Sequence, residues 1–172
     1  MPALQSIIHT IVSGGQAGVD RAALDFAIAV GIAHGGWCPK GRKAEDGAIP
    51  AVYQLKEINS GDYRQRTRLN VQDSEATLVF NMGVLEGGSL LTVEVAKRMQ
   101  KPCLVIQLDD SDREEATASV IRWLVAGGYH VLNIAGPRES KRPGIYRAAH
   151  AFLEQLNATG RRGTRPERVS CP

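Results

Sequence analysis

Three glycine-containing segments carry the residues best suited to bind an anion. The first is residues 13–18 (S-G-G-Q-A-G), the second is 86–89 (E-G-G-S), and the third is 136–140 (G-P-R-E-S). Glycines let backbone amides approach an anion closely, and a following helix adds the positive end of its dipole. The first segment has neither the G-x-G-x-x-G spacing nor the Lys-Ser/Thr pair of a Walker A motif. It therefore indicates either a phosphate site or a tight turn that needs positive φ.

Charged residues near these segments could complete such a site. Arg138 could bind two phosphate oxygens at once, although an ion pair with Glu139 or a solvent-facing position is the alternative. Arg42 lies in a charged loop and could add a second positive charge. Glu94, just over one turn into the helix after the second segment, could act as an acid/base or bind a ribose, or could be a solvated helix carboxylate. The predicted ligand-binding residues are Ser13, Gly14, Gly15, Gln16, Gly18, Arg42, Gly87, Gly88, Ser89 and Arg138.

The sequence gives little support to metal or nucleophilic chemistry. Cys38, Cys103 and Cys171 form no C-x-x-C pair and are odd in number, which argues against a disulfide framework or a structural zinc site. No spacing of His, Cys and carboxylates is typical of zinc, and no Ser-His-Asp or Cys-His order is legible. We therefore expect neither zinc nor haem.

The elements that must position these segments alternate along the chain. Short apolar runs typical of strands are followed by segments whose apolar residues recur at helical spacing. Such alternation is typical of a parallel α/β sheet covered on both faces, and right-handed crossovers make it doubly wound. The expected strands are Ile7–Val12, Ile32–Trp37, Tyr53–Ile58, Ala76–Asn81, Cys103–Leu108 and His130–Ala135. The expected helices are Ala17–Val30, Asp62–Asp73, Ser89–Gln100, one from Ser111 to Gly127, and one from Pro143.

In a doubly wound sheet, ligands bind outside the carboxyl ends of the strands. All three glycine-containing segments follow predicted strands, so all three belong to this edge. Because we expect the strands before the first two segments to be neighbouring and central, we expect these segments to share one anion site. A charged loop, Lys40–Gly47, lies between the second and third expected strands.

Length and composition indicate one domain. The chain has 172 residues, of which 43% are hydrophobic and 23% are charged. We expect a single domain over residues 1–158. The net charge of +3 equals the excess of residues 159–172, which hold four arginines and one acid, so the body is neutral and nucleic-acid binding is not expected. The tail itself is expected to be disordered, or to contact an anionic partner.

The sequence contains no apolar run of about 18 residues and no basic-then-apolar segment before a cleavage site. We therefore expect a cytoplasmic protein that does not enter the membrane.

Five ordered blocks resemble the family called putative molybdenum carrier proteins, a branch of the SLOG superfamily of Rossmann-like proteins. The blocks are residues 13–25, 35–42 (G-G-W-C-P-K-G-R), 66–74 (R-T-x-x-N-V-x-D-S), 87–89 and 133–140 (N-x-A-G-P-R-E-S). One departure is Ala17, where the family is expected to have Thr. The resemblance implies a Rossmann-like doubly wound fold, assembly into a homo-oligomer (dimer or tetramer) and binding of a phosphate-bearing ligand.

The resemblance allows two functions. The first is a non-enzymatic carrier or sensor of a phosphorylated ligand such as molybdenum cofactor or a nucleotide. The second is a hydrolase of the N-glycosidic bond of a nucleotide, with Glu94 as acid/base, similar to the cytokinin-activating phosphoribohydrolases of the same superfamily. Their pattern resembles P-G-G-x-G-T-x-x-E, whereas residues 85–94 read L-E-G-G-S-L-L-T-V-E. Because the leading Pro and the Gly-Thr pair are missing, the sequence favours the binding protein.

Overall fold

The computed structural model describes residues 2–110 and 112–161, with side chains up to residue 159. Its centre is a five-stranded sheet in the order β2-β1-β9-β7-β8, and neighbouring strands are parallel. The strands are β1 (Thr10–Val12), β2 (Ala33–Gly35), β7 (Ala76–Asn81), β8 (Cys103–Gln107) and β9 (Val131–Ala135). The helices are α1 (Leu4–Ile7), α2 (Val19–Val30), α3 (Tyr63–Gln72), α4 (Gly87–Arg98), α5 (Arg113–Gly127) and α6 (Ile145–Arg161).

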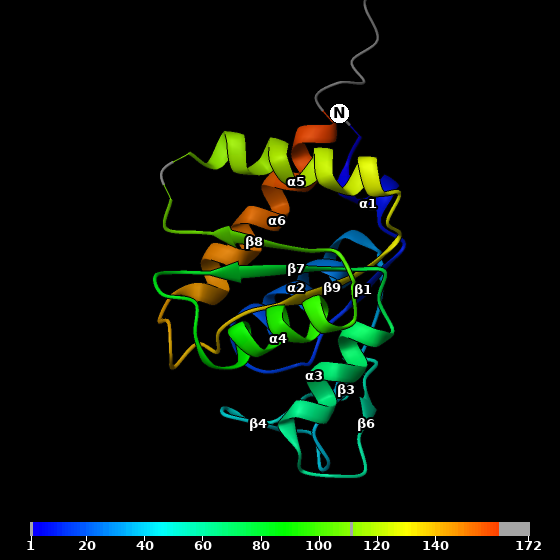
Figure 1. Ribbon diagram of the computed structural model, residues 1–172, viewed down its shortest axis with the longest axis vertical. Coiled ribbons are helices and arrows are strands. Elements are labelled where there is room, and N and C mark those ends of the chain that lie inside the picture. The colour runs from blue at the N-terminus through cyan, green and yellow to red at the C-terminus, as the bar shows by residue number, and fades with distance from the viewer. Residues whose placement is uncertain (1, 111, 162–172) are drawn as a thin grey trace, which may run out of the picture.

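Helices cover both faces of the sheet (Figure 1). On one face α2 packs against α6, and α1 and α5 also contact α6. α4 crosses the other face, and α3 packs against it. The predicted Rossmann-like, doubly wound, mainly parallel α/β sheet is therefore confirmed.

The middle of the sheet fixes the edge at which the loops emerge. All six residues of β7 are buried, because this strand lies between β9 and β8 under helices on both faces. Its Phe80 packs edge-to-face on Phe152 of α6, with ring centroids 5.3 Å apart. Val79 of β7 is in register with Ala135, the last residue of β9. The loops that follow these two strands therefore start side by side.

Residues 36–62 leave the main sheet and form two small sheets. β3 (Trp37–Cys38) runs parallel to β6 (Lys56–Glu57), and β4 (Lys43–Ala44) forms a hairpin with β5 (Gly47–Ala48). The guanidinium of Arg42 donates to the carbonyls of Ile49, Pro50, Tyr53 and Leu55. This arginine is thus used to hold the segment together.

Several element boundaries differ from those expected. α1 takes up the start of the expected strand Ile7–Val12, which shortens β1. The expected strand Ile32–Trp37 is divided at Gly36, because Gly36 has φ +130° and a Cβ there would lie 2.1 Å from the Ser13 carbonyl oxygen. The expected loop Lys40–Gly47 contains most of the β4–β5 hairpin.

Each of the five expected helices begins one or two residues from its expected start, and the shifts of α4 and α6 lie at the loops that follow β7 and β9. α4 begins at Gly87 rather than at Ser89, and Glu86 is its N-cap. α6 begins at Ile145 rather than at Pro143, because the glycine between them has φ +89° and is not helical.

The order of the strands also differs from our expectation. β9 lies between β1 and β7, so the first two glycine-containing segments do not follow neighbouring strands. α6 extends to Arg161, into the start of the expected tail, and residues 162–172 lie outside the described residues.

Candidate functional site

A polar cavity of about 400 Å³ opens at the carboxyl edge of the sheet. The loop after β7 and the first turn of α4 face the loop after β9 across it, and the start of α3 forms a further wall. Its lining includes Tyr63, Asn81, Gly87, Gly88, Ser89, Arg138 and Lys141. The second and third glycine-containing segments therefore meet in one cavity, at the edge where doubly wound sheets bind ligands.

The first turn of α4 offers backbone amides to this cavity. The first amides of a helix have no partner within it, and Glu86, the N-cap residue, makes no side-chain cap. The amides of Gly87, Gly88 and Ser89 thus stand at the positive end of a helix dipole. Glycine at position 88 lets the Tyr63 ring pack directly on the helix start, because a Cβ there would lie 2.2 Å from the Tyr63 hydroxyl oxygen in the observed position of the ring. This wall of the cavity is suited to an anion.

Arg142 holds the loop between β7 and α4 in place. Its Nε donates to the Met82 carbonyl at 2.7 Å, and its Nη2 donates to the Val84 carbonyl and to Glu86 Oε1, both at 3.0 Å. The side chain is 24% exposed. Arg142 lines the cavity, but its donors are spent on positioning the start of α4.

Arg138 and Lys141 add positive charge to the cavity, and among the described residues their side chains have fewer partners than that of Arg142. Arg138 Nε lies 3.9 Å from Glu45 Oε2, too far for a hydrogen bond, and the side chain is 41% exposed. The alternative partner considered for Arg138, Glu139, instead accepts hydrogen bonds from two amides at the start of α6. The ammonium group of Lys141 contacts no acceptor within the described part of the chain. Both cations are therefore available to a ligand.

Asn81 contributes a hydrogen-bond acceptor that the sequence analysis missed. It is 1% exposed and lies at the carboxyl end of β7. Its Nδ2 donates to the Gly83 carbonyl at 2.8 Å and to Gln107 Oε1 at 3.1 Å, which fixes the orientation of the amide. Oδ1 is buried and has no partner among the described residues. A ligand with an N–H or O–H group next to its anion would satisfy this oxygen.

The first segment, residues 13–18, lies beside the cavity and outside its lining. The Ser13 hydroxyl donates to the Ile134 carbonyl at 2.7 Å. Gln16 Oε1 accepts two backbone amide bonds, at 2.8 and 3.0 Å. These polar groups are used to join β1, β9 and the hairpin.

The glycines of this segment serve a tight turn. Gly15 and Gly18 have φ of +80° and +99°, in the region that favours glycine. A Cβ at Gly18 would lie 2.4 Å from the Pro137 carbonyl oxygen, so the glycine lets the first segment pack directly on the third.

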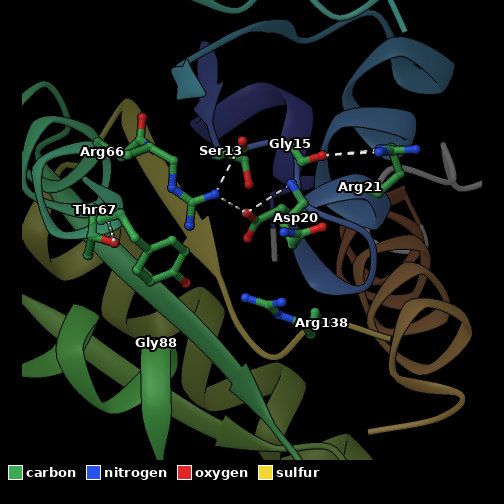
Figure 2. A network of polar contacts seen from close by, with 12 residues as sticks. Ser13, Gly15, Asp20, Arg21, Arg66, Thr67, Gly88 and Arg138 are labelled. Atoms are coloured by element: carbon green, nitrogen blue, oxygen red, sulfur yellow. Dashed lines mark hydrogen bonds and ion pairs between the residues drawn. The ribbon is translucent and has the colours of Figure 1, made fainter. Parts of the chain in front are cut away.

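Asp20 and Arg66 form a buried ion pair (Figure 2), and the sequence analysis selected neither of them. Asp20 and Arg66 are 4% and 5% exposed, and Arg66 Nη1 lies 3.6 Å from Asp20 Oδ2. Burial raises the pKa of Asp20, against the opposing effect of the Arg66 charge. A Cβ at Gly14 would lie 2.6 Å from Arg66 Nη1, so glycine makes room for the guanidinium. A second cavity, of about 10 Å³, is lined by Gly14, Asp20, Arg66, Thr67, Asn70, Thr92, Asn133 and Ala135.

Two of the residues considered from the sequence lie away from the 400 Å³ cavity. Arg42 is bound to carbonyls of its own segment. Glu94 is exposed on α4, where its carboxylate lies 3.7 Å from Arg98. Neither side chain lines the cavity.

The parallel sheet, covered on both faces and with a polar cavity at its carboxyl edge, places the chain among the Rossmann-like α/β proteins. Residues 11–157 match the circularly permutated YpsA SLOG family, and the chain belongs to this family. The resemblance to a SLOG branch seen in the sequence is confirmed.

A solved structure is similar over most of the chain. It is the crystal structure of a protein named "putative molybdenum carrier protein" from Syntrophus aciditrophicus SB. The two proteins are 51% identical, with a TM-score of 0.85, and the match covers 87% of this chain and 95% of that one. The comparison with curated proteins gives no match. None of the helices in the described residues has the length and apolar character needed to cross a bilayer.

Proposed function

We propose that this protein binds a small phosphate-bearing ligand in the 400 Å³ cavity. One observation carries the proposal: the uncapped start of α4 and the available cations Arg138 and Lys141 face the same cavity. Backbone amides at a helix N-terminus bind phosphate through hydrogen bonds and the helix dipole, and a guanidinium can add two charge-assisted bonds. Asn81 Oδ1 would accept a hydrogen bond from another part of the same ligand.

Molybdenum cofactor is one candidate for the ligand, as cargo rather than as a resident group. The name of the similar protein from Syntrophus aciditrophicus SB supports it. Among the described residues, no group of three or more His, Cys, Asp or Glu side chains could hold a metal ion. The amides and cations of the cavity suit the phosphate of such a cofactor better than a bare metal ion. A nucleotide would satisfy the same groups.

The N-glycosidase alternative draws no support from the site. Glu94, its expected acid/base, is exposed and paired with Arg98 outside the cavity. We therefore propose a carrier or sensor role, and the homo-oligomer remains a prediction.

Mass spectrometry of the ligand released from gently purified protein tests the proposal. We expect a phosphate-bearing molecule in wild-type protein and about ten- to a hundredfold weaker binding of that molecule by Arg138→Met, because a lost charge-assisted hydrogen bond costs about 1.5–3 kcal/mol. Arg147→Met is the matched control, since Arg147 is exposed on α6 and does not line the cavity. Equal affinities in the two variants would contradict a ligand site at Arg138.

A further inference from the structure

Arg66 is a buried arginine with a free edge. Its contacts with Asp20 and with the Gly14 carbonyl, at 3.6 and 3.4 Å, both involve Nη1. Nε is buried and has no hydrogen-bond partner among the described residues. The edge formed by Nε and Nη2 is one that can bind a carboxylate or phosphate through two parallel hydrogen bonds. Buried guanidinium donors nearly always have partners, so this edge points to a missing one.

The ring of Tyr63 lies between Arg66 and the ligand cavity. The Arg66 Cζ atom lies 4.5 Å from the centroid of this ring. The Tyr63 hydroxyl packs on Gly88 in the first turn of α4. It forms no hydrogen bond with any residue in the described part of the chain. Tyr63 lines the 400 Å³ cavity, whereas Arg66 is outside that lining and lines the 10 Å³ cavity next to Gly14.

We propose that Tyr63 is a gate and that Arg66 is a further ligand-binding residue behind it. The proposal rests on the proposed function and adds a group to the same site. When the ring turns away, the space between Arg66 and Gly88 is open to an oxyanion such as a phosphate group. The oxyanion then contacts the free edge of Arg66 on one side and the amides of α4 on the other.

The contacts of Arg66 explain how an oxyanion can displace the Tyr63 ring. A ring stacked on a guanidinium gives a favourable cation–π contact but leaves the buried Nε without an acceptor. An oxyanion supplies that acceptor and a full negative charge. Asp20 need not leave, because it contacts Nη1 and its Oδ2 also accepts the Gln16 amide at 3.3 Å. The ligand therefore competes with the Tyr63 ring and not with Asp20.

Chemical labelling of arginines tests the gate without altering Arg66. Wild-type protein, Tyr63→Ala and Tyr63→Phe are treated with phenylglyoxal, and modification of Arg66, Arg138 and Arg147 is followed by peptide mass spectrometry with and without millimolar inorganic phosphate. We expect slow labelling of Arg66 in the wild type and in Tyr63→Phe, which keeps the ring, and faster labelling in Tyr63→Ala. Phosphate should slow Arg66 labelling in Tyr63→Ala and leave the exposed control Arg147 unchanged.

A calorimetric titration with inorganic phosphate gives a second readout with a definite sign. If only a fraction of the molecules has the gate open, the apparent Kd equals the Kd of the open form divided by that fraction. Tyr63→Ala should therefore bind phosphate more tightly than the wild type, by about tenfold if one wild-type molecule in ten is open. Tyr63→Phe, which keeps the ring, should bind phosphate more weakly than Tyr63→Ala. Weaker binding by Tyr63→Ala would show that the ring contacts the ligand and would overturn the gate.

The outcomes separate this proposal from the one on which it rests. Protection of Arg138 by phosphate without protection of Arg66 in Tyr63→Ala contradicts the gate and leaves the ligand site standing. Unchanged labelling of Arg66 in Tyr63→Ala also contradicts the gate. Absence of protection at both arginines in all three proteins contradicts the gate together with the phosphate site itself.

Discussion

Arg142→Met is expected to loosen the start of α4, because Arg142 ties the preceding loop to the sheet edge. The variant keeps an apolar stem of similar length but loses the bonds to the carbonyls of Met82 and Val84. A hydrogen bond from a charged donor contributes about 1.5–3 kcal/mol, and the lower figure applies to a side chain that is 24% exposed. Two such bonds give about 3 kcal/mol, or a fall in Tm of about 6–12 °C for a chain of this size.

Urea denaturation and differential scanning calorimetry measure this change, and titration with inorganic phosphate measures its effect on the site. We expect weaker phosphate binding as well, because the amides of Gly87 and Gly88 are no longer held at a fixed distance from Arg138. Arg147→Met removes an equally charged side chain from an exposed position of α6 and should change neither quantity by more than about 0.5 kcal/mol. If the two variants had the same stability, Arg142 would not be the residue that positions the loop.

Three further predictions concern the scaffold. Arg42→Met should lower the stability by about 2–4 kcal/mol and leave phosphate affinity unchanged, because its donors hold four carbonyls outside the cavity; weaker phosphate binding at equal stability would refute this. Gly18→Ala should lower Tm and promote protease cleavage within the first or third segment, because its Cβ would lie 2.4 Å from the Pro137 carbonyl oxygen. An unchanged Tm would contradict this close approach. Hydrogen bonds from the backbone amides of His130 and Val131 lower the pKa of Glu75 in the folded protein. The stability that these bonds contribute is therefore present above pH 4.5, the pKa of Glu75 in the unfolded chain, and is lost as the pH falls through its pKa in the folded protein. Glu75→Gln should therefore lose less stability than the wild type on acidification below pH 4.5, as measured by urea denaturation at several pH values.

The fold could be predicted from the sequence because its central signals are local. The run A-T-L-V-F-N of β7 is mostly apolar, and the apolar residues of α2 recur at helical spacing, so each pattern predicts its element locally. The order of the strands depends instead on contacts between distant parts of the chain. β9 inserts between β1 and β7, and no local pattern in residues 131–135 records that position. The sequence therefore predicts one cavity for the first and second glycine-containing segments, whereas in the structure the first segment lies beside the cavity.

The same limit applies to the arginines and explains which site residues were missed. α3 carries Arg64, Arg66 and Arg68 on a polar sequence, and only the packing of α3 against α4 and the first segment buries the middle one. The signal in the sequence that could have singled it out is its place in the block R-T-x-x-N, which the resemblance already contained. Asn81 ends a strand that is mostly apolar. Its unpartnered Oδ1 is evident only in the structure, where the amide nitrogen donates to Gly83 and Gln107.

Charge and hydrogen-bonding capacity are distributed separately around the cavity. Arg142 is fully charged and lines the cavity, yet its Nε and Nη2 are committed to the loop before α4, so it contributes to the positive potential without offering these donors to a ligand. Arg138 and Lys141 keep donors free but are more exposed, so water and salt screen them more strongly. A site of this kind attracts anions broadly through its potential and selects among them through the few free donors. Ionic strength should therefore weaken the binding of every anion that the cavity accepts, whereas substitution of Arg138 should weaken only those anions that reach its guanidinium.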